Sequence, residues 1–182
     1  MSKINYLLPL IFILFSCNPS KNEEIDQTGM SFQTDDSSKL YFKNVRQNYY
    51  DVETMEEAKL EVYRLKKRST QEEEPIINLS IVNNWRYDEA YILLEPNQKA
   101  GSLNQLRLSF SNKDGEFGQI IFDGGNKQQH LEFASKIYEQ LLKEAQFQLI
   151  LGTDKLDILN DTKSREAFRI TMFDYYRLVR SL

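Results

Sequence analysis

Cysteine and histidine are almost absent from this chain of 182 residues, which contains one of each, Cys17 and His130. A single cysteine excludes a disulfide framework within the chain. A single histidine excludes a metal site built on several imidazoles and any nucleophile system that needs a pair of histidines. We therefore expect no cofactor and no metal, and enzymatic activity is the less favoured interpretation.

Long apolar runs are also missing. The longest, residues 6–15, has ten residues, whereas a helix needs about 20 to cross a bilayer. This run follows Lys3 and ends at Ser16 and Cys17, a pattern typical of an export signal.

The end of that run, Leu14-Phe15-Ser16-Cys17, resembles the lipobox of bacterial lipoproteins. The resemblance implies that residues 1–16 are removed as a signal peptide and that the thiol of Cys17 carries diacylglycerol, with the new amino group acylated, as by palmitate. It also implies an anchor in the cell envelope, at the periplasmic or surface face of the outer membrane. Phe15 departs from the small residue usual at its position, so a cleaved secretory peptide and an uncleaved tether stay open as alternatives.

Residues 17–38 differ in composition from the rest of the mature chain. They are rich in Asn, Ser, Gln, Thr and Asp, and residues 18–38 carry a net charge of −4. Such a segment buries too little apolar surface to offset its ordering entropy, so we expect a disordered tether. Residues 21–24, Lys-Asn-Glu-Glu, resemble the short acidic signal of surface-exported lipoproteins of the Bacteroidota type, and a solvated linker is the alternative.

Residues 39–182 form the expected folded part, a single domain of 144 residues without an internal repeat. They hold 21 of the 23 basic and 22 of the 27 acidic residues. This balance gives no reason to expect nucleic acid as a partner.

Alternating patterns predict strands through the first two thirds of this domain. We expect strands at 40–46, 77–81, 90–94, 106–111 and 117–123, with a hairpin turn at Asp114-Gly115. Residues 54–68 fit a capped helix or a strand, and we predict a strand from about Ala58.

Helical periodicity follows. Asn126 and Gln129 predict the start of an amphipathic helix that runs to about Gln146. A second, smaller hairpin is expected at 147–158, and Asp161 or Thr162 should cap a final amphipathic helix, packed on two sides or offering a contact patch beside Phe173. The predicted fold class is α+β, with a mostly antiparallel meander covered by these two helices.

Several segments of the domain resemble uncharacterised lipoproteins of the Bacteroidota type. The resemblance spans most of residues 39–182, supports the anchor and implies no activity. The segments are Asn44-Val45-Arg46, Asn84-Trp85, residues 88–91 and residues 166–172.

One loop gathers side chains suited to binding. It contains the only Trp of the chain together with a Tyr, an amide, an Arg and two carboxylates: Asn84, Trp85, Arg86, Tyr87, Asp88 and Glu89. Loops between strands often carry binding residues, and aromatic faces beside amides and carboxylates suit a glycan or a peptide. The alternative is that Trp85 packs into the core and Asp88 caps a turn. Asp88 and Glu89 could in principle act on a glycoside, but neighbours on a strand alternate faces.

Three weaker candidates have simpler explanations. His130 falls in the first turn of its helix, where we expect it to pack. Asp154, Asp157 and Asp161 lack the ligand order of an EF-hand. Gly124-Gly125 lacks the Lys of a phosphate loop and is expected to form a turn.

The sequence therefore leaves three function classes open. The first is a membrane-anchored envelope protein, held through lipid on Cys17, with a non-catalytic interaction or accessory domain. The second is a ligand-binding module for a glycan or peptide that uses the 83–89 loop. A hydrolase based on carboxylates is the third.

Overall fold

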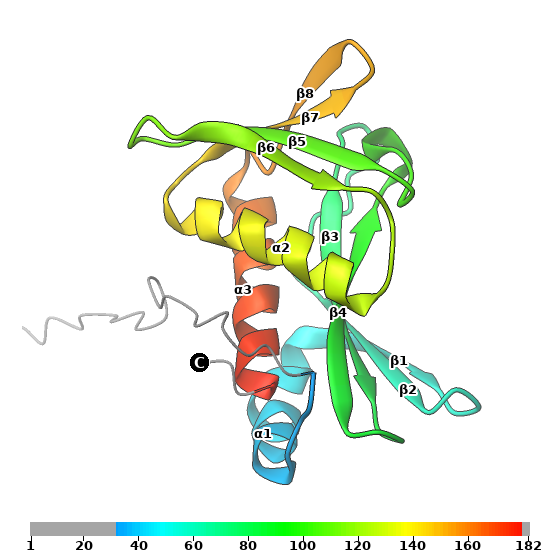
Figure 1. The fold of residues 1–182 in the computed structure, drawn as a ribbon. Coiled ribbons are helices and arrows are strands. Elements are labelled where there is room, and N and C mark those ends of the chain that lie inside the picture. Colours follow the sequence, from blue (N-terminus) through cyan, green and yellow to red (C-terminus); the bar gives the residue numbers. More distant parts are fainter. Residues whose placement is uncertain (1–31, 180–182) are drawn as a thin grey trace, which may run out of the picture.

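Two antiparallel sheets of four strands each, with helices between them, make up the fold (Figure 1). The computed structural model describes residues 32–179. The predicted α+β class is confirmed, with one difference: the strands form two sheets instead of one continuous meander.

Sheet A is a meander in the strand order β1-β2-β3-β4. Its strands are β1 (Tyr50–Met55), β2 (Leu60–Leu65), β3 (Ile77–Asn84) and β4 (Glu89–Pro96). Tyr63, Ile81 and Ile92 lie opposite one another across three strands, and all are buried. The period-two pattern thus places one face of this sheet in the core.

Sheet B has the order β6-β5-β7-β8. Its strands are β5 (Leu106–Ser111), β6 (Phe117–Phe122), β7 (Gln146–Leu151) and β8 (Asp154–Ile158). The expected second hairpin, β7–β8, pairs with β5 through Leu108 and Leu149 instead of standing apart. Gly115 in the β5–β6 turn has φ +84°, a conformation that favours glycine.

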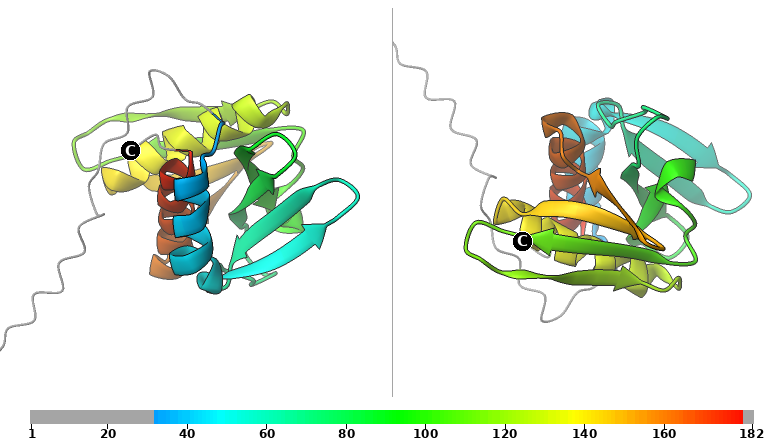
Figure 2. Two further views of the ribbon diagram at one scale, coloured as in Figure 1. Left: turned by 90° about the horizontal axis from the view of Figure 1, so that it is seen from below. Right: turned by 90° about the horizontal axis from the view of Figure 1, so that it is seen from above.

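Both predicted amphipathic helices are present. Helix α2 (Lys127–Leu142) starts with the predicted capping box between Asn126 and Gln129. Helix α3 (Thr162–Leu178) starts at Asp161, whose carboxylate accepts a hydrogen bond from the Ser164 amide at 2.9 Å. Helix α2 contacts β4 of sheet A and β6 of sheet B, so it joins the two sheets (Figures 1 and 2).

Helix α3 is packed on more than one side. Phe168, Met172 and Tyr175 are buried, while Tyr176 bonds to Ser135 of α2 over 2.8 Å between hydroxyl oxygens. On another side, the buried carboxylate of Asp174 accepts hydrogen bonds from the segment before β1. This helix is therefore a central element of the core.

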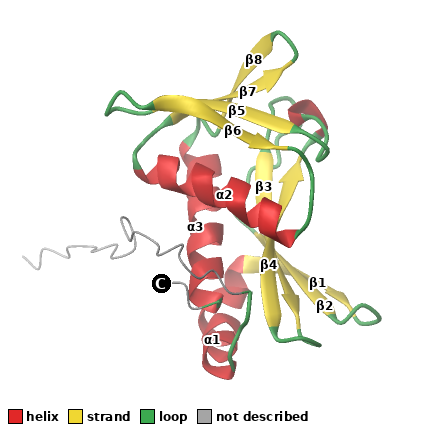
Figure 3. Cartoon of the chain, in the orientation of Figure 1, coloured by secondary structure: helices red, strands yellow, loops and turns green. Residues whose placement is uncertain are grey.

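The expected strand at 40–46 is wrong, because this segment is helical (Figure 3). It comprises α1 (Asp36–Tyr41), the π-helix η1 (Phe42–Arg46) and the 3₁₀-helix η2 (Gln47–Tyr49). Asp35 caps α1 by accepting from the amides of Ser37 and Ser38 at 2.8 and 2.9 Å. Leu40 and Val45 are exposed, so these apolar residues do not form the buried face of a strand.

The boundary expected at residue 39 also needs correction. Residues 32–38, which we assigned to the tether, belong to the folded domain, since Gln33 bridges to Glu89 and α1 begins at Asp36. The predicted signal peptide, Cys17 and the rest of the expected tether lie outside the described residues. Within residues 32–179, no helix combines the length and apolarity needed to cross a membrane.

The ambiguous segment 54–68 contains a strand, as predicted. Thr54 belongs to β1 and does not cap a helix. A turn over residues 56–59, with Lys59 at φ +60°, leads into β2. The element that the sequence prediction missed here is β1, the partner of β2.

Candidate functional site

The loop between β3 and β4 is a tight, ordered turn. The side chain of Asn84 accepts a hydrogen bond from the Arg86 amide at 3.2 Å, and the amide of Trp85 donates to the carbonyl of Lys59 at 3.2 Å. Asp88 has φ +51°. The Tyr87 side chain is 62% exposed, so this loop presents it to solvent.

The two carboxylates of the loop are bound in different ion pairs. Oδ1 of Asp88 accepts a hydrogen bond from Nζ of Lys39 at 2.7 Å, and this bond raises the pKa of Lys39. Glu89 lies 2.6 Å from Lys127 at the start of α2. The carboxylate pair that sequence reasoning considered for acid–base work therefore does not converge on one site.

The first described residues of the chain run along this loop. The amide of Thr34 donates to the carbonyl of Asp88 at 2.7 Å, and the amide of Ala90 donates to the carbonyl of Phe32 at 2.8 Å. The ammonium of Lys127 lies 4.6 Å from the centre of the Phe32 ring. The loop thus marks the place where the chain enters the domain.

Trp85 lines an open hollow of about 410 Å³, here called the Trp85 hollow. The other lining residues come from η1, from β1 and the turn after it, and from β2: Lys43, Thr54, Glu56 and Glu61. Trp85 is half-buried and lies outside the hydrophobic core. Of the six predicted loop residues, Trp85 alone lines this hollow, and the predicted role of the loop in binding stays a prediction.

Buried groups hold Glu61 in place. Its Oε2 accepts a hydrogen bond from the Tyr63 hydroxyl at 2.5 Å and another from the Asn83 amide at 3.2 Å. Tyr63 and Asn83 are 1% and 5% exposed. Burial, with the hydrogen bond to Glu61, raises the pKa of Tyr63 far above its ordinary value, so the hydroxyl stays protonated and remains a donor.

The polar side chains that line the Trp85 hollow keep hydrogen-bonding capacity. Among the described residues, the side chains of Lys43, Thr54 and Glu56 make no hydrogen bond or ion pair, and Oε1 of Glu61 accepts none. The hollow therefore presents donors and acceptors together beside an aromatic face.

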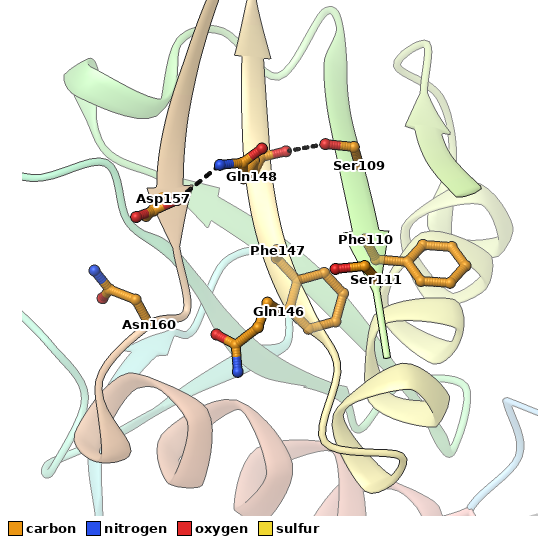
Figure 4. Close-up of a pocket in the computed structure, with 8 residues that line it drawn as sticks. All are labelled: Ser109, Phe110, Ser111, Gln146, Phe147, Gln148, Asp157 and Asn160. Carbon is orange, nitrogen blue, oxygen red and sulfur yellow. Dashed lines mark hydrogen bonds between the residues drawn. The ribbon is translucent and has the colours of Figure 1, made fainter. Parts of the chain in front are cut away.

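A second hollow of about 400 Å³ lies on sheet B (Figure 4). Across it, Gln148 donates to Asp157 at 3.1 Å, and the Ser109 hydroxyl donates to the Gln148 carbonyl at 3.5 Å. Of its two aromatic residues, Phe147 is buried and Phe110 is half-buried. The side chain and carbonyl of Gln148 are thus already engaged with neighbouring strands, and Phe147 offers no exposed ring face.

The weaker candidates have structural roles. His130 is buried, its Nδ1 accepts a hydrogen bond from the Leu94 amide at 3.1 Å, and burial lowers its pKa. Asp157 is bound by Gln148, and Asp161 caps α3. No cluster of three metal-ligating side chains occurs within residues 32–179.

Comparisons of the chain with protein-family models, with curated proteins and with solved structures found no match. Sequence reasoning missed Lys43, Thr54, Glu56 and Glu61, which lie beside Trp85 only through the folding of η1 and sheet A. Only Glu61 could have been noticed in the sequence, because a charged residue on the strand face that also holds the buried Tyr63 and Leu65 is unusual.

Proposed function

We propose that this protein is a lipoprotein of the cell envelope, anchored through lipid on Cys17, with a domain that acts as a non-catalytic interaction or accessory module. The lipobox-like residues 14–17 support the anchor. The observation that carries the proposal is the docking of Phe32 beside the 84–89 loop, with its carbonyl 2.8 Å from the Ala90 amide. Phe32 follows Cys17 by only 15 residues.

This spacing limits how far the loop can be from the lipid. A stretch of 15 residues spans at most roughly 50 Å when fully extended. Tyr87 and Trp85 would then face partners at or near the membrane surface, at the periplasmic or surface face of the outer membrane. A protein or a glycan fits this position, and the nearly balanced charge of the domain gives no support for nucleic acid.

A ligand-binding module is the second candidate, favoured by the position of Trp85 in a hollow. Glu56 and Glu61 also line this hollow, which is the observation that keeps a carboxylate-based hydrolase as the third. In such an enzyme one carboxyl group must serve as a proton donor. The hydrogen bonds to Oε2 of Glu61 come from donors, Tyr63 and Asn83, and they suit a carboxylate that accepts.

The anchor is tested by substitution of Cys17. Cells producing the wild-type protein should incorporate labelled palmitate into it and retain it on membranes after a carbonate wash. Cys17→Ser should abolish both, whereas Ser20→Ala, a nearby control, should change neither. Retention of Cys17→Ser on washed membranes would contradict the lipid anchor.

The interaction role is tested with photo-crosslinking groups in living cells. A group at Tyr87, 62% exposed, should capture a membrane-associated partner, and one at Phe117 on sheet B, 85% exposed, should not. Equal capture from both positions would argue against a specific surface around the loop.

A further inference from the structure

We propose that the Trp85 hollow is a binding site for a neutral carbohydrate. This inference rests on the proposed interaction role and adds the chemical class of the ligand. The site consists of Trp85, Lys43, Thr54, Glu56 and Glu61, and its volume of about 410 Å³ falls within the range of roughly 300–1,000 Å³ that is usual for small-molecule sites.

Trp85 supplies a platform. Its backbone amide donates to the Lys59 carbonyl at 3.2 Å, the residue is half-buried, and its ring stacks on no other aromatic ring of residues 32–179. The face of an indole carries negative potential. The weakly positive C–H groups of one face of a sugar ring pack well against such a surface.

The polar groups around this platform match hydroxyl groups. The Lys43 ammonium donates, the carboxylates of Glu56 and Glu61 accept, and the Thr54 hydroxyl does both. A sugar hydroxyl is itself both a donor and an acceptor. A sugar hydroxyl can therefore bond to Lys43, to the carboxylates or to Thr54, whereas a ligand that only donates or only accepts can use just some of these groups.

Charge separates this ligand from the other small polar ligands. Two carboxylates in the hollow disfavour phosphate and other anions, because like charges repel. Lys43 offsets one of these two charges and so reduces the attraction of the hollow for an amine, and the polar lining disfavours an apolar ligand. A neutral polyhydroxyl compound can use both the donors and the acceptors of this lining.

Glu61 is positioned before any ligand arrives. Tyr63 and Asn83 fix its Oε2 from the buried side, which leaves Oε1 for a ligand. A preorganised acceptor loses little conformational freedom on binding. We therefore assign Glu61 as the main hydrogen-bonding residue and Trp85 as the main stacking residue.

The single tryptophan of the chain makes a direct test possible, because its fluorescence reports this hollow alone. The full chain is extracted in lauryldimethylamine oxide, a detergent without sugar, and titrated with maltotriose, cellotriose and N,N′-diacetylchitobiose. At least one saccharide should produce a saturable change in emission. Glu61→Gln should weaken saccharide binding about tenfold, as expected when a hydrogen bond to a charged group is replaced by one to a neutral group.

Phe117→Ala is the control, since Phe117 is 85% exposed on β6 of sheet B and does not line the hollow; the affinity of this variant should equal that of the wild type. Thr54→Val, at an exposed position, replaces Glu61→Gln if that variant has a lower thermal midpoint. The proposal fails if none of the three saccharides changes the emission, if n-butylamine or phosphate produces the saturable change instead, or if Phe117→Ala weakens binding as much as Glu61→Gln. Lipid labelling of Cys17 is unaffected by these results, so failure here and failure of the anchor are distinguishable.

Discussion

The buried carboxylate of Asp174 should be the polar group whose loss destabilises the domain most. Asp174 is 2% exposed and accepts two hydrogen bonds from the Arg46 guanidinium, at 2.8 and 2.9 Å, and one from the Tyr50 hydroxyl at 2.6 Å. These bonds join η1 and β1 to α3. Burial raises the pKa of Tyr50, and Asp174 raises it further, so Tyr50 remains a donor. Burial disfavours the charged form of Arg46, but Asp174 outweighs this and raises the pKa of Arg46.

Asp174→Ala would leave a buried hydroxyl and a partly buried guanidinium without their partner. Breaking a buried ion pair costs about 3–5 kcal/mol, and because the Arg46 side chain is 25% exposed we expect a value near the lower limit. Urea unfolding followed by Trp85 fluorescence and by circular dichroism should show a midpoint lower by about 1–3 M. Tyr50→Phe removes one hydrogen bond to Asp174 and should lower the free energy of unfolding by about half as much as Asp174→Ala does.

Lys113→Ala is the control, because it breaks an ion pair with Glu144 in which both side chains are more than 60% exposed. Exposed pairs contribute about 0–1 kcal/mol. If Asp174→Ala shifts the urea midpoint no more than Lys113→Ala does, the cluster does not hold α3 to the rest of the domain.

Three further predictions concern pH, the core and the N-terminal boundary. Burial lowers the pKa of His130 below its ordinary value of 6.5, so the unfolded chain binds more protons below pH 6.5, and the free energy of unfolding should fall as pH drops from 7 to 5.5. His130→Asn keeps an acceptor for the Leu94 amide and should remove this slope; an unchanged slope would exclude His130 as its cause. Phe168→Ala should lower the free energy of unfolding by about 3–5 kcal/mol, since the residue is 2% exposed. Phe173→Ala, at a half-buried position, should lower it clearly less in thermal unfolding. Equal effects would mean that both faces of α3 are equally buried. Limited proteolysis should leave a fragment that begins before Phe32, because residues 32–34 pair with the β3–β4 loop and β4; a stable fragment that begins near residue 39 would contradict that pairing.

The sequence predicted those elements whose stabilising contacts are local. The capping box of Asn126 and Gln129 and the cap at Asp161 lie within three residues of their partners, and both helix starts are confirmed. The β3–β4 and β5–β6 hairpins were predictable because alternation and turn residues are adjacent in the chain. For α1, the local signal was present in Asp35 and Ser38, but it fell in the segment that composition assigned to the tether.

Contacts between distant segments could not be predicted in this way. The pairing of β7 with β5 divides the strands into two sheets, and nothing in the alternation of either strand specifies that partner. The same holds for the candidate site. Trp85 was identified as a binding residue by its composition and loop position, whereas Lys43 and Glu61 join it through an unforeseen π-helix and through the register of β2 on β3.

A lipid on Cys17 would hold this domain at a membrane, as we propose. The intact mass of the protein extracted from cell membranes, followed by fragmentation of its N-terminal peptide, tests this anchor. We expect a chain that begins at Cys17 and carries diacylglycerol on the thiol and an acyl group on the new amino group. A chain that begins at Met1, or one cleaved elsewhere with an unmodified Cys17, would contradict it.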